Sequence, residues 1–442
     1  MTTRAFESPV HGDGVGGLAL YSVESFQGYG VVRFRGATGS DSLVSVKVTE
    51  IPCGFDLSYI RAVAQSLCPA PDAAAAAAAD ATPAAAGDGA DLQVASMSSG
   101  ASSLAERDDS AYLLHGNARA GEALAGPWRR ASESAAAATG AVVVLSAGME
   151  PEQAEGFRTA AHEALQSARD IAYLSALRHT NIATVHSWHC GVCLQHCPSS
   201  APHVGSDNVL VRCARSGGGS GGGSSVLRLR PALEQDLHSD GSGADAGAPV
   251  CLALVTDCDR GHPWRAGGSE AGRLAIVLTL LDAAQALQFL HASGLVHRGL
   301  QPSALQRCSA AASTADPRGW ACRLADFGFA APFGAARVSE PLGPLHCIPP
   351  EGFNGRPPSP AWDIWAFGVL MWRCVYNTRL PYGDDDLGRV AALVRYGARP
   401  LFDYSVPYAY RMLANACWAQ DPAARLTAGN LVGELLSLLH SS

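Results

Sequence analysis

The sequence predicts an α+β protein of two lobes, with a β-rich N-terminal lobe followed by a helical C-terminal lobe. Short segments of alternating apolar residues fill the first part of the chain, whereas helical periodicity dominates after residue 272. Strands and helices therefore occupy separate parts of the chain, which favours an α+β body over a doubly wound parallel sheet. We place the N-terminal lobe at residues 18–257 and the C-terminal lobe at residues 258–440.

Alternating apolar residues predict the strands of the N-terminal lobe. Residues 31–34 and 44–48 form two such runs, with a glycine-containing turn between them. Further strands are expected at residues 141–146 (AVVVLS), 182–188, 208–213 and 251–256.

Three segments predict helices. Residues 152–178 are rich in good helix formers. Residues 272–292 repeat leucine, valine and alanine at helical spacing and predict a strongly apolar helix. Helical patterns then dominate from Ala361 to the end of the chain.

Three low-complexity stretches interrupt the N-terminal lobe. Residues 69–140 are dominated by Ala, Gly, Ser, Asp and Pro, residues 214–225 read ARSGGGSGGGSS, and residues 238–249 are similar in composition. Such stretches bury little apolar area, so we expect disordered insertions. The rest of the 442 residues fits a single domain of ordinary size.

Composition excludes several classes of partner. Only 16% of residues are charged and the net charge is −8, which argues against nucleic acid and anionic membranes. The N-terminus has no apolar signal segment, and no run approaches the ~20 apolar residues of a membrane span. Thirteen scattered cysteines suit a reducing environment, so we expect a soluble, cytoplasmic protein.

A cluster of Cys and His residues has two interpretations. The segment HSWHCGVCLQHC at residues 186–197 contains a C-x-x-C pair flanked by histidines. This spacing could bind zinc, although no second half-site is obvious. The alternative is a hairpin loop with free thiols.

Lysine usage singles out one residue. The chain contains 32 lysine and arginine residues, and Lys47 is the only lysine among them. Lysine differs from arginine as a compact point charge that can reach a phosphate. Lys47 lies inside the predicted strand V-S-V-K, which favours a function over an ordinary surface position.

An ordered series of motifs over roughly residues 20–440 resembles the protein kinase fold, closest to its tyrosine-kinase-like Ser/Thr branch. The motifs are V-S-V-K (44–47), L-R-H-T-N-I (177–182), L-A-L-V-T-D (252–257), H-R-G-L (297–300), A-D-F-G (325–328), P-P-E (349–351), D-I-W-A-F-G (363–368) and C-W-A-Q-D-P-A-A-R (417–425).

The resemblance implies an ATP site in the N-terminal lobe. Lys47 would pair with phosphates and with an acidic residue of the 152–178 helix, either Asp170 or Glu163. An alternative alignment makes residues 141–146 the third strand and supplies no lysine there. The remaining expected nucleotide contacts are Gly30, Val32, Ser45, Thr256 at the gatekeeper place, and the hinge residues Asp257 and Cys258.

The resemblance also shows what is missing from the catalytic loop. Gly299 replaces the aspartate that receives the substrate proton, Gln301 replaces the loop lysine, and Ala304 replaces a metal-binding asparagine. Asp326 could still hold metal, so ATP with at most one Mg²⁺ is the cofactor that the resemblance implies.

The scaffold motifs, by contrast, are complete. Asp363 would hold the His297–Arg298 turn, and Glu351 would pair with Arg425. An apolar column that joins the two lobes would consist of Leu174, Val185, His297 and Phe327.

Three functions remain open from the sequence. The leading hypothesis is a pseudokinase, a nucleotide-binding scaffold or allosteric signalling module with weak or no phosphotransfer. The second is a residual Ser/Thr kinase, and the third is an interaction domain that binds no nucleotide. Protein partners are expected in each case.

Overall fold

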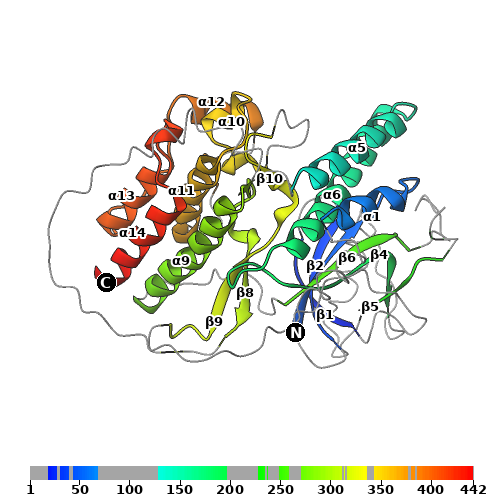
Figure 1. The fold of residues 1–442 in the computed structure, drawn as a ribbon, viewed down its shortest axis with the longest axis horizontal. Coiled ribbons are helices and arrows are strands. Elements are labelled where there is room, and N and C mark those ends of the chain that lie inside the picture. Colours follow the sequence, from blue (N-terminus) through cyan, green and yellow to red (C-terminus); the bar gives the residue numbers. More distant parts are fainter. Residues whose placement is uncertain are drawn as a thin grey trace, which may run out of the picture.

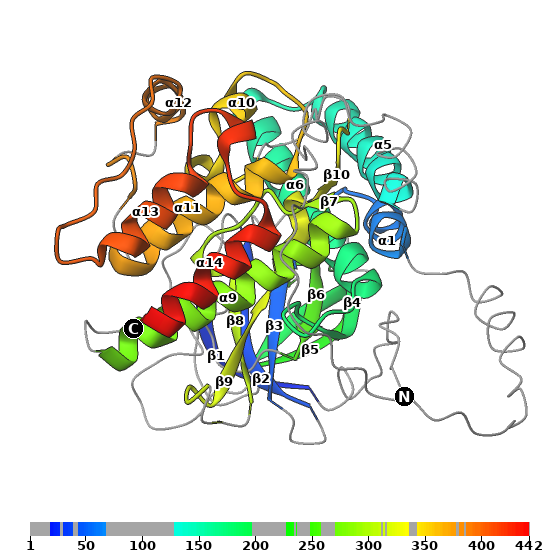
Figure 2. The same cartoon turned by 60° about the vertical axis from the view of Figure 1, so that its left-hand side comes forward.

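The computed structural model describes residues 18–26, 30–38, 43–67, 128–196, 227–233, 236, 248–257, 270–310, 313, 316–335, 343–376, 380–383 and 386–441. Figures 1 and 2 show a sheet-rich N-terminal lobe beside a helical C-terminal lobe. The predicted two-lobed α+β fold is therefore confirmed.

One antiparallel sheet forms the N-terminal lobe and closes into a barrel in the order β1-β2-β3-β6-β4-β5. Its strands are β1 (Ala19–Phe26), β2 (Val31–Ala37), β3 (Leu43–Glu50), β4 (Val185–His196), β5 (Leu227–Pro231) and β6 (Cys251–Thr256). The strands predicted at residues 31–34, 44–48 and 251–256 are confirmed.

Strand alternation decides which side chains fill the barrel. Val32 and Phe34 on β2 pack with Val44, Val46 and Val48 of β3 in one buried apolar cluster. Successive side chains of a strand point to opposite faces. The residues between them, among them Lys47 and its cross-strand partner Arg33, therefore face out of the barrel toward the C-terminal lobe.

Three helices cover the barrel, namely α1 (Leu57–Gln65), α5 (Arg129–Ser146) and α6 (Pro151–Ala176). The helix predicted at residues 152–178 is α6, which begins with proline at its first position, where no backbone N–H is needed. Helix α5 lies alongside α6 in Figure 1.

Helix α5 corrects two predictions. Residues 141–146 are helical and form no strand, and residues 129–140 belong to this helix although they were counted in the insertion 69–140. Ala131, Ala135, Ala138 and Val142 recur at helical spacing and are buried. Alanine contributes little apolar area alone, but a row of alanines allows two helices to approach closely, and composition does not reveal that.

Other predictions in this lobe are partly corrected or lie outside the described residues. The strand predicted at 182–188 begins at Val185, and Ile182 makes an isolated bridge with Leu324. Residues 69–127, 208–213, 214–225 and 238–247 lie outside the described residues.

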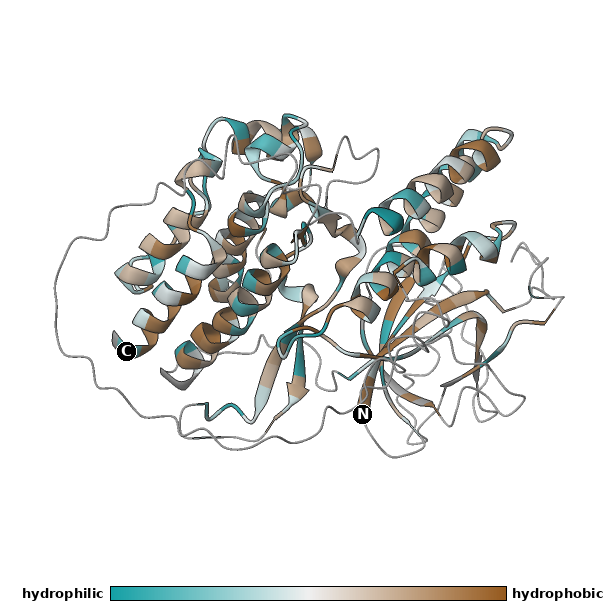
Figure 3. Ribbon diagram, in the orientation of Figure 1, coloured by the Kyte–Doolittle hydropathy of each residue, from teal (hydrophilic) through white to brown (hydrophobic). Residues whose placement is uncertain are grey.

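Helices form most of the C-terminal lobe: α9 (Glu270–Ala292), α10 (Pro350–Phe353), α11 (Pro360–Tyr376), α12 (Leu387–Arg395), α13 (Tyr408–Cys417) and α14 (Ala428–Ser441). Two short two-stranded sheets lie at the boundary between the lobes, β7 (Leu295–Val296) with β10 (Ala331–Pro332), and β8 (Leu305–Ser309) with β9 (Trp320–Leu324). Figure 3 shows hydrophobic residues running along α9, the predicted apolar helix.

Helix α9 also corrects the expectation that no segment is long and apolar enough to cross a membrane. Residues Gly272–Ala292 meet that criterion by length and composition, with a mean hydropathy of 1.5. Half of this window is buried inside the protein, and α9 packs against α14 and β9. A core helix of the C-terminal lobe accounts for the same composition.

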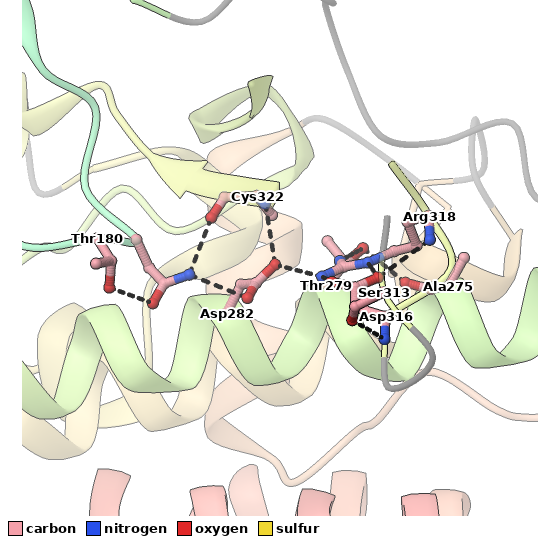
Figure 4. A network of polar contacts seen from close by, with 9 residues as sticks. Thr180, Ala275, Thr279, Asp282, Ser313, Asp316, Arg318 and Cys322 are labelled. Atoms are coloured by element: carbon pink, nitrogen blue, oxygen red, sulfur yellow. Dashed lines mark hydrogen bonds and ion pairs between the residues drawn. The ribbon is translucent and has the colours of Figure 1, made fainter. Parts of the chain in front are cut away.

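A polar network fastens the segment after α6 to the C-terminal lobe (Figure 4). Asn181 Nδ2 donates to Asp282 Oδ1 at 3.0 Å, and Asp282 Oδ2 accepts from Cys322 N and from Arg318, each at 2.9 Å. Burial raises the pKa of Asp282 above its ordinary value, with Arg318 opposing that shift. Trp128, just before α5, adds a bond from its indole N–H to Ser293 O at 2.7 Å.

Candidate functional site

Lys47 lies at the centre of a buried group of charges between the lobes. Its Nζ lies 3.2 Å from Asp170 Oδ2 on α6 and 3.2 Å from Asp326 Oδ1 in the turn after β9. Burial by itself lowers the pKa of Lys47, but Asp326 and Asp170 together outweigh burial, so the pKa is raised. The only lysine of the chain is therefore held charged by two carboxylates.

Asp170, and not Glu163, forms the ion pair with Lys47. Asp170 Oδ1 also accepts from the backbone N–H of Phe327 at 2.8 Å, so one carboxylate joins β3, α6 and the turn after β9. The short side chain of Asp170 reaches Lys47 because α6 packs directly on the turn after β9. A Cβ on Gly328 would lie 2.8 Å from the backbone oxygen of Gln166, so glycine is required there. The alternative third strand at 141–146 is wrong, because that segment is helical.

Asp326 carries two cations on one oxygen. Its Oδ1 accepts from Lys47 Nζ and, at 2.8 Å, from Arg33 Nη2. Burial by itself raises the pKa of this carboxyl, but Lys47 and Arg33 lower the pKa to about 2. Its backbone has φ +61°, a left-handed conformation that turns the carboxylate toward β3.

Arg33 is a site residue that the sequence reasoning missed. It stands opposite Lys47 in the β2–β3 pairing and is only 3% exposed. Gln306 on β8, with its amide oxygen turned toward the guanidinium, accepts from both Nη atoms of Arg33. The signal was the alternation of β2, because a residue that pairs with Lys47 must share its face of the sheet.

The roof of the cleft is polar where an apolar contact was expected. Val32 was predicted to cover the nucleotide, but its side chain is fully buried in the barrel, on the opposite face from Lys47. Arg35, not Val32, faces the cleft opposite Ser45 and bonds Glu24 Oε1 at 3.3 Å. Ser45 Oγ bonds Glu24 Oε2 at 3.4 Å, which completes this polar roof.

The remaining predicted nucleotide contacts lie at the edge of the cleft. Gly30 precedes β2 with φ +77°, a conformation that favours glycine. Thr256 is buried and donates to Ser45 O at 3.4 Å. Asp257 pairs with Arg323 and accepts from Thr184 N at 3.0 Å, so its carboxylate is engaged within the chain. Cys258 lies outside the described residues.

The catalytic loop keeps its shape without its reactive side chains. Asp363 on α11 accepts from the backbone N–H groups of His297 and Arg298, both at 2.8 Å. Gly299 follows this turn and is buried, and its N–H donates to His297 Nδ1 at 3.2 Å. Ala304 is fully buried at the place of the second metal ligand. Gln301 is half-buried at the start of the next turn.

The expected connections within and between the lobes are also formed. Leu174, Val185 and Phe327 are buried in one apolar cluster, and the ring of the buried His297 contacts that of Phe327 with 4.8 Å between the ring centroids. Arg425 forms a two-bond ion pair with Glu351 at 2.7 and 2.9 Å.

Comparisons with known proteins match the C-terminal part of this fold. The family described as protein tyrosine and serine/threonine kinase matches residues 237–435. The chain contains a protein kinase domain. The match agrees with the predicted tyrosine-kinase-like branch. It begins after Lys47 and Asp170, so the structure, and not the family match, is what connects these two residues to the kinase domain.

Relatives of the kinase domain come from distant organisms. A probable serine/threonine-protein kinase of Dictyostelium discoideum is 30% identical over 165 residues, 37% of this chain and 11% of the relative. The serine/threonine-protein kinase PknA of Mycobacterium tuberculosis is 29% identical over 199 residues, 44% of each chain. A dual serine/threonine and tyrosine protein kinase of Bos taurus is 30% identical over 218 residues, 46% of this chain and 22% of the relative. The chain thus spans less than half of each.

Kinase domains commonly use ATP with Mg²⁺, but the residues of this cleft do not fit the metal. Mg²⁺ demands several oxygen ligands in near-octahedral geometry. Asp326 is the one carboxylate at the expected place, its Oδ1 is already bonded by Lys47 and Arg33, and Ala304 offers no oxygen. Among the described residues, no group of three or more His, Cys, Asp or Glu side chains could hold a metal ion.

The Cys and His residues of β4 that the structure describes also form no group that could hold a metal ion. Burial, with Asp236 nearby, raises the pKa of Cys193 to about 12, which disfavours the thiolate that zinc requires. Its thiol donates to Ala248 O at 3.5 Å, and His189 is buried beside Ser187. Cys197 lies outside the described residues.

Proposed function

We propose that this kinase domain is a pseudokinase, a signalling module that acts through protein partners with weak or no phosphotransfer. The observation that carries the proposal is Gly299, which stands in a correctly held catalytic loop at the place of the proton acceptor. A positioned general base contributes ~10²–10⁴ in rate. Gln301 and Ala304 remove the loop cation and the second metal ligand as well, and these losses need not be additive.

The complete scaffold supports retention of the shape for another use. Asp363 and the Glu351–Arg425 pair hold the C-terminal lobe together, and the buried column through Phe327 joins that lobe to the N-terminal lobe. Breaking one member of a buried ion pair costs about 3–5 kcal/mol. These contacts support a rigid surface that a protein partner could recognise.

We also propose a reducing, cytoplasmic setting. Among the described residues, six cysteines are buried as free thiols, namely Cys193, Cys308, Cys322, Cys347, Cys374 and Cys417.

A residual Ser/Thr kinase is the second candidate. The Lys47–Asp170 ion pair favours it, because this pair is required of an active kinase domain. The named relatives are Ser/Thr or dual-specificity kinases. A loose transition state also makes modest demands on a general base.

Transfer of labelled γ-phosphate to generic protein substrates separates these candidates. The parent chain and Asp326→Asn are compared at equal concentration, because this change removes the one carboxylate at the position where a kinase would hold metal. We expect phosphate transfer by both proteins to equal that of a protein-free blank. Transfer by the parent at rates of about 1–100 s⁻¹, abolished in Asp326→Asn, would establish the residual kinase instead.

A further inference from the structure

We propose that Arg33 occupies the cation position on Asp326, so that the chain's own side chains fill the cleft and Mg²⁺-nucleotide is kept out. This goes beyond the proposed function, because a pseudokinase can lose catalysis and still bind nucleotide. The inference starts from a contact that no catalytic motif predicts, namely Arg33 Nη2 at 2.8 Å from Asp326 Oδ1.

The strand register makes this contact a fixed feature of the fold. Arg33 pairs with Lys47, while Val32 and Phe34 on either side are fixed in the barrel core. A one-residue slip of β2 would turn those apolar side chains outward and the arginine inward. The guanidinium therefore cannot leave the cleft face without disrupting the barrel.

The charges at the site already balance. Lys47 and Arg33 oppose Asp326 and Asp170, with Lys47 bonded to both carboxylates and Arg33 to Asp326. Glu163 lies on α6 on the N-terminal side of Asp170, and burial raises its pKa. Burial lowers the pKa of His297 in the catalytic loop. A divalent cation on Asp326 would meet two buried positive charges at close range.

Neighbouring residues complete the arginine's site in place of a nucleotide site. With its amide oxygen turned toward the guanidinium, Gln306 accepts from both Nη atoms of Arg33. Glu24 holds Arg35 and Ser45 together in the roof. These polar side chains are unusual in a nucleotide cleft. They bond one another, Gln306 with Arg33 and Glu24 with Arg35 and Ser45.

Thermal unfolding of the full chain tests the proposal, with ATP and with ADP, each with and without Mg²⁺. Arg33→Met removes the charge but keeps the length of the side chain. Arg158→Met is the control, since Arg158 lies on the same helix as Asp170, is solvent-accessible and pairs with the exposed Glu155. A ligand that binds only the native state raises the melting temperature.

We expect no nucleotide-dependent shift for the parent or Arg158→Met, and a Mg²⁺-dependent shift of several degrees for Arg33→Met. A shift of the parent with either nucleotide would overturn the proposal, as would no shift in Arg33→Met. If Arg33→Met does not fold, Mn²⁺ titration of the parent with ADP, followed by electron paramagnetic resonance, decides: stoichiometric bound Mn²⁺ contradicts the proposal and free Mn²⁺ supports it. Nucleotide binding by the parent without phosphotransfer would sink this inference alone, whereas transfer would sink the pseudokinase proposal.

Discussion

Four buried or half-buried charges decide what the cleft can hold. Asp326 shares one oxygen between Lys47 and Arg33, and Asp170 ties Lys47 to the backbone of Phe327. Attraction between these groups is stronger here than it would be in water, because the surroundings exclude solvent. The same arrangement makes the site sensitive to the loss of any one member.

The low pKa of Asp326 predicts how the protein responds to acid. Its pKa of about 2 lies below the unfolded value of about 3.9, so the stabilisation is present above pH 4 and is lost as pH falls from about 4 to about 2. Arg33→Met removes one of the two cations that lower the folded-state pKa, so the loss of stability should be smaller and should be complete at a higher pH. Urea unfolding between pH 2 and 7 measures the free energy of unfolding at each pH. Identical pH profiles for Arg33→Met and the parent would show that Arg33 does not lower the pKa of Asp326.

Restoring the catalytic side chains alone should not restore catalysis. Gly299→Asp with Ala304→Asn supplies the base and a metal ligand, but Arg33 still holds Asp326. A Cβ at position 299 would lie 3.2 Å from Phe329, so a small shift of that ring is also needed. We expect background phosphotransfer from this double variant and a measurable increase when Arg33→Met is added. High activity of the double variant would show that Arg33 is no obstacle.

The residues of the site differed in how well the sequence revealed them. Lys47 and Asp326 could be found because their motifs have characteristic neighbours, whereas the sequence left Asp170 and Glu163 as alternatives for the acidic partner. Arg33 was missed because Val32 was expected to face the nucleotide, and alternation along β2 then places Arg33 on the opposite face. The pairing of β2 with β3 shows the reverse, with Arg33 on the same face as Lys47 and Val32 in the barrel.

At the scale of elements, helix α5 is the largest difference from the sequence prediction. The run AVVVL reads equally well as a buried strand or as part of a helix, because periodicity alone does not separate them over so few residues. The strands β2, β3 and β6 and the helices α6 and α9 were predictable, since each carries a long or regular pattern. Helix α5 is defined by its packing on α6.

Adjacent alanines of α5 offer a matched test of that packing. Ala138 is 1% exposed, whereas Ala137 is exposed. Ala138→Glu should lower the free energy of unfolding by about 3 kcal/mol or more, because it buries an unpaired charge. Ala137→Glu should change it by less than about 0.5 kcal/mol. Chemical denaturation measures both, and equal small effects would mean that α5 does not pack on α6.

At the scale of the whole molecule, contacts outside the Lys47 site also join the two lobes. The buried column through Phe327 runs between them, the Asn181–Asp282 bond fastens the segment after α6, and Trp128 bonds Ser293. These contacts need no nucleotide. The arrangement that we propose partners recognise is therefore built from the chain itself.

Phe327 tests whether the lobes depend on that column. Phe327→Ala should lower the free energy of unfolding by about 3–5 kcal/mol, because the ring is fully buried. Phe329→Ala is the control, since the same residue type two positions on is only half-buried and should lose less. Partner binding, once a partner is in hand, should weaken more in Phe327→Ala than in Gly299→Asp. Equal stability losses in both phenylalanine variants would contradict the proposed role of the column.

Hydrogen exchange at the Phe327 amide tests the central claim most directly, namely that the chain holds its cleft closed without nucleotide. That N–H donates to the buried Asp170 carboxylate, so its exchange reports whether α6, Lys47 and the turn after β9 stay together. We expect slow exchange of this amide in the nucleotide-free protein, unchanged by millimolar ATP with Mg²⁺. Rapid exchange that slows when ATP and Mg²⁺ are added would show that a nucleotide, and not Arg33, completes the site.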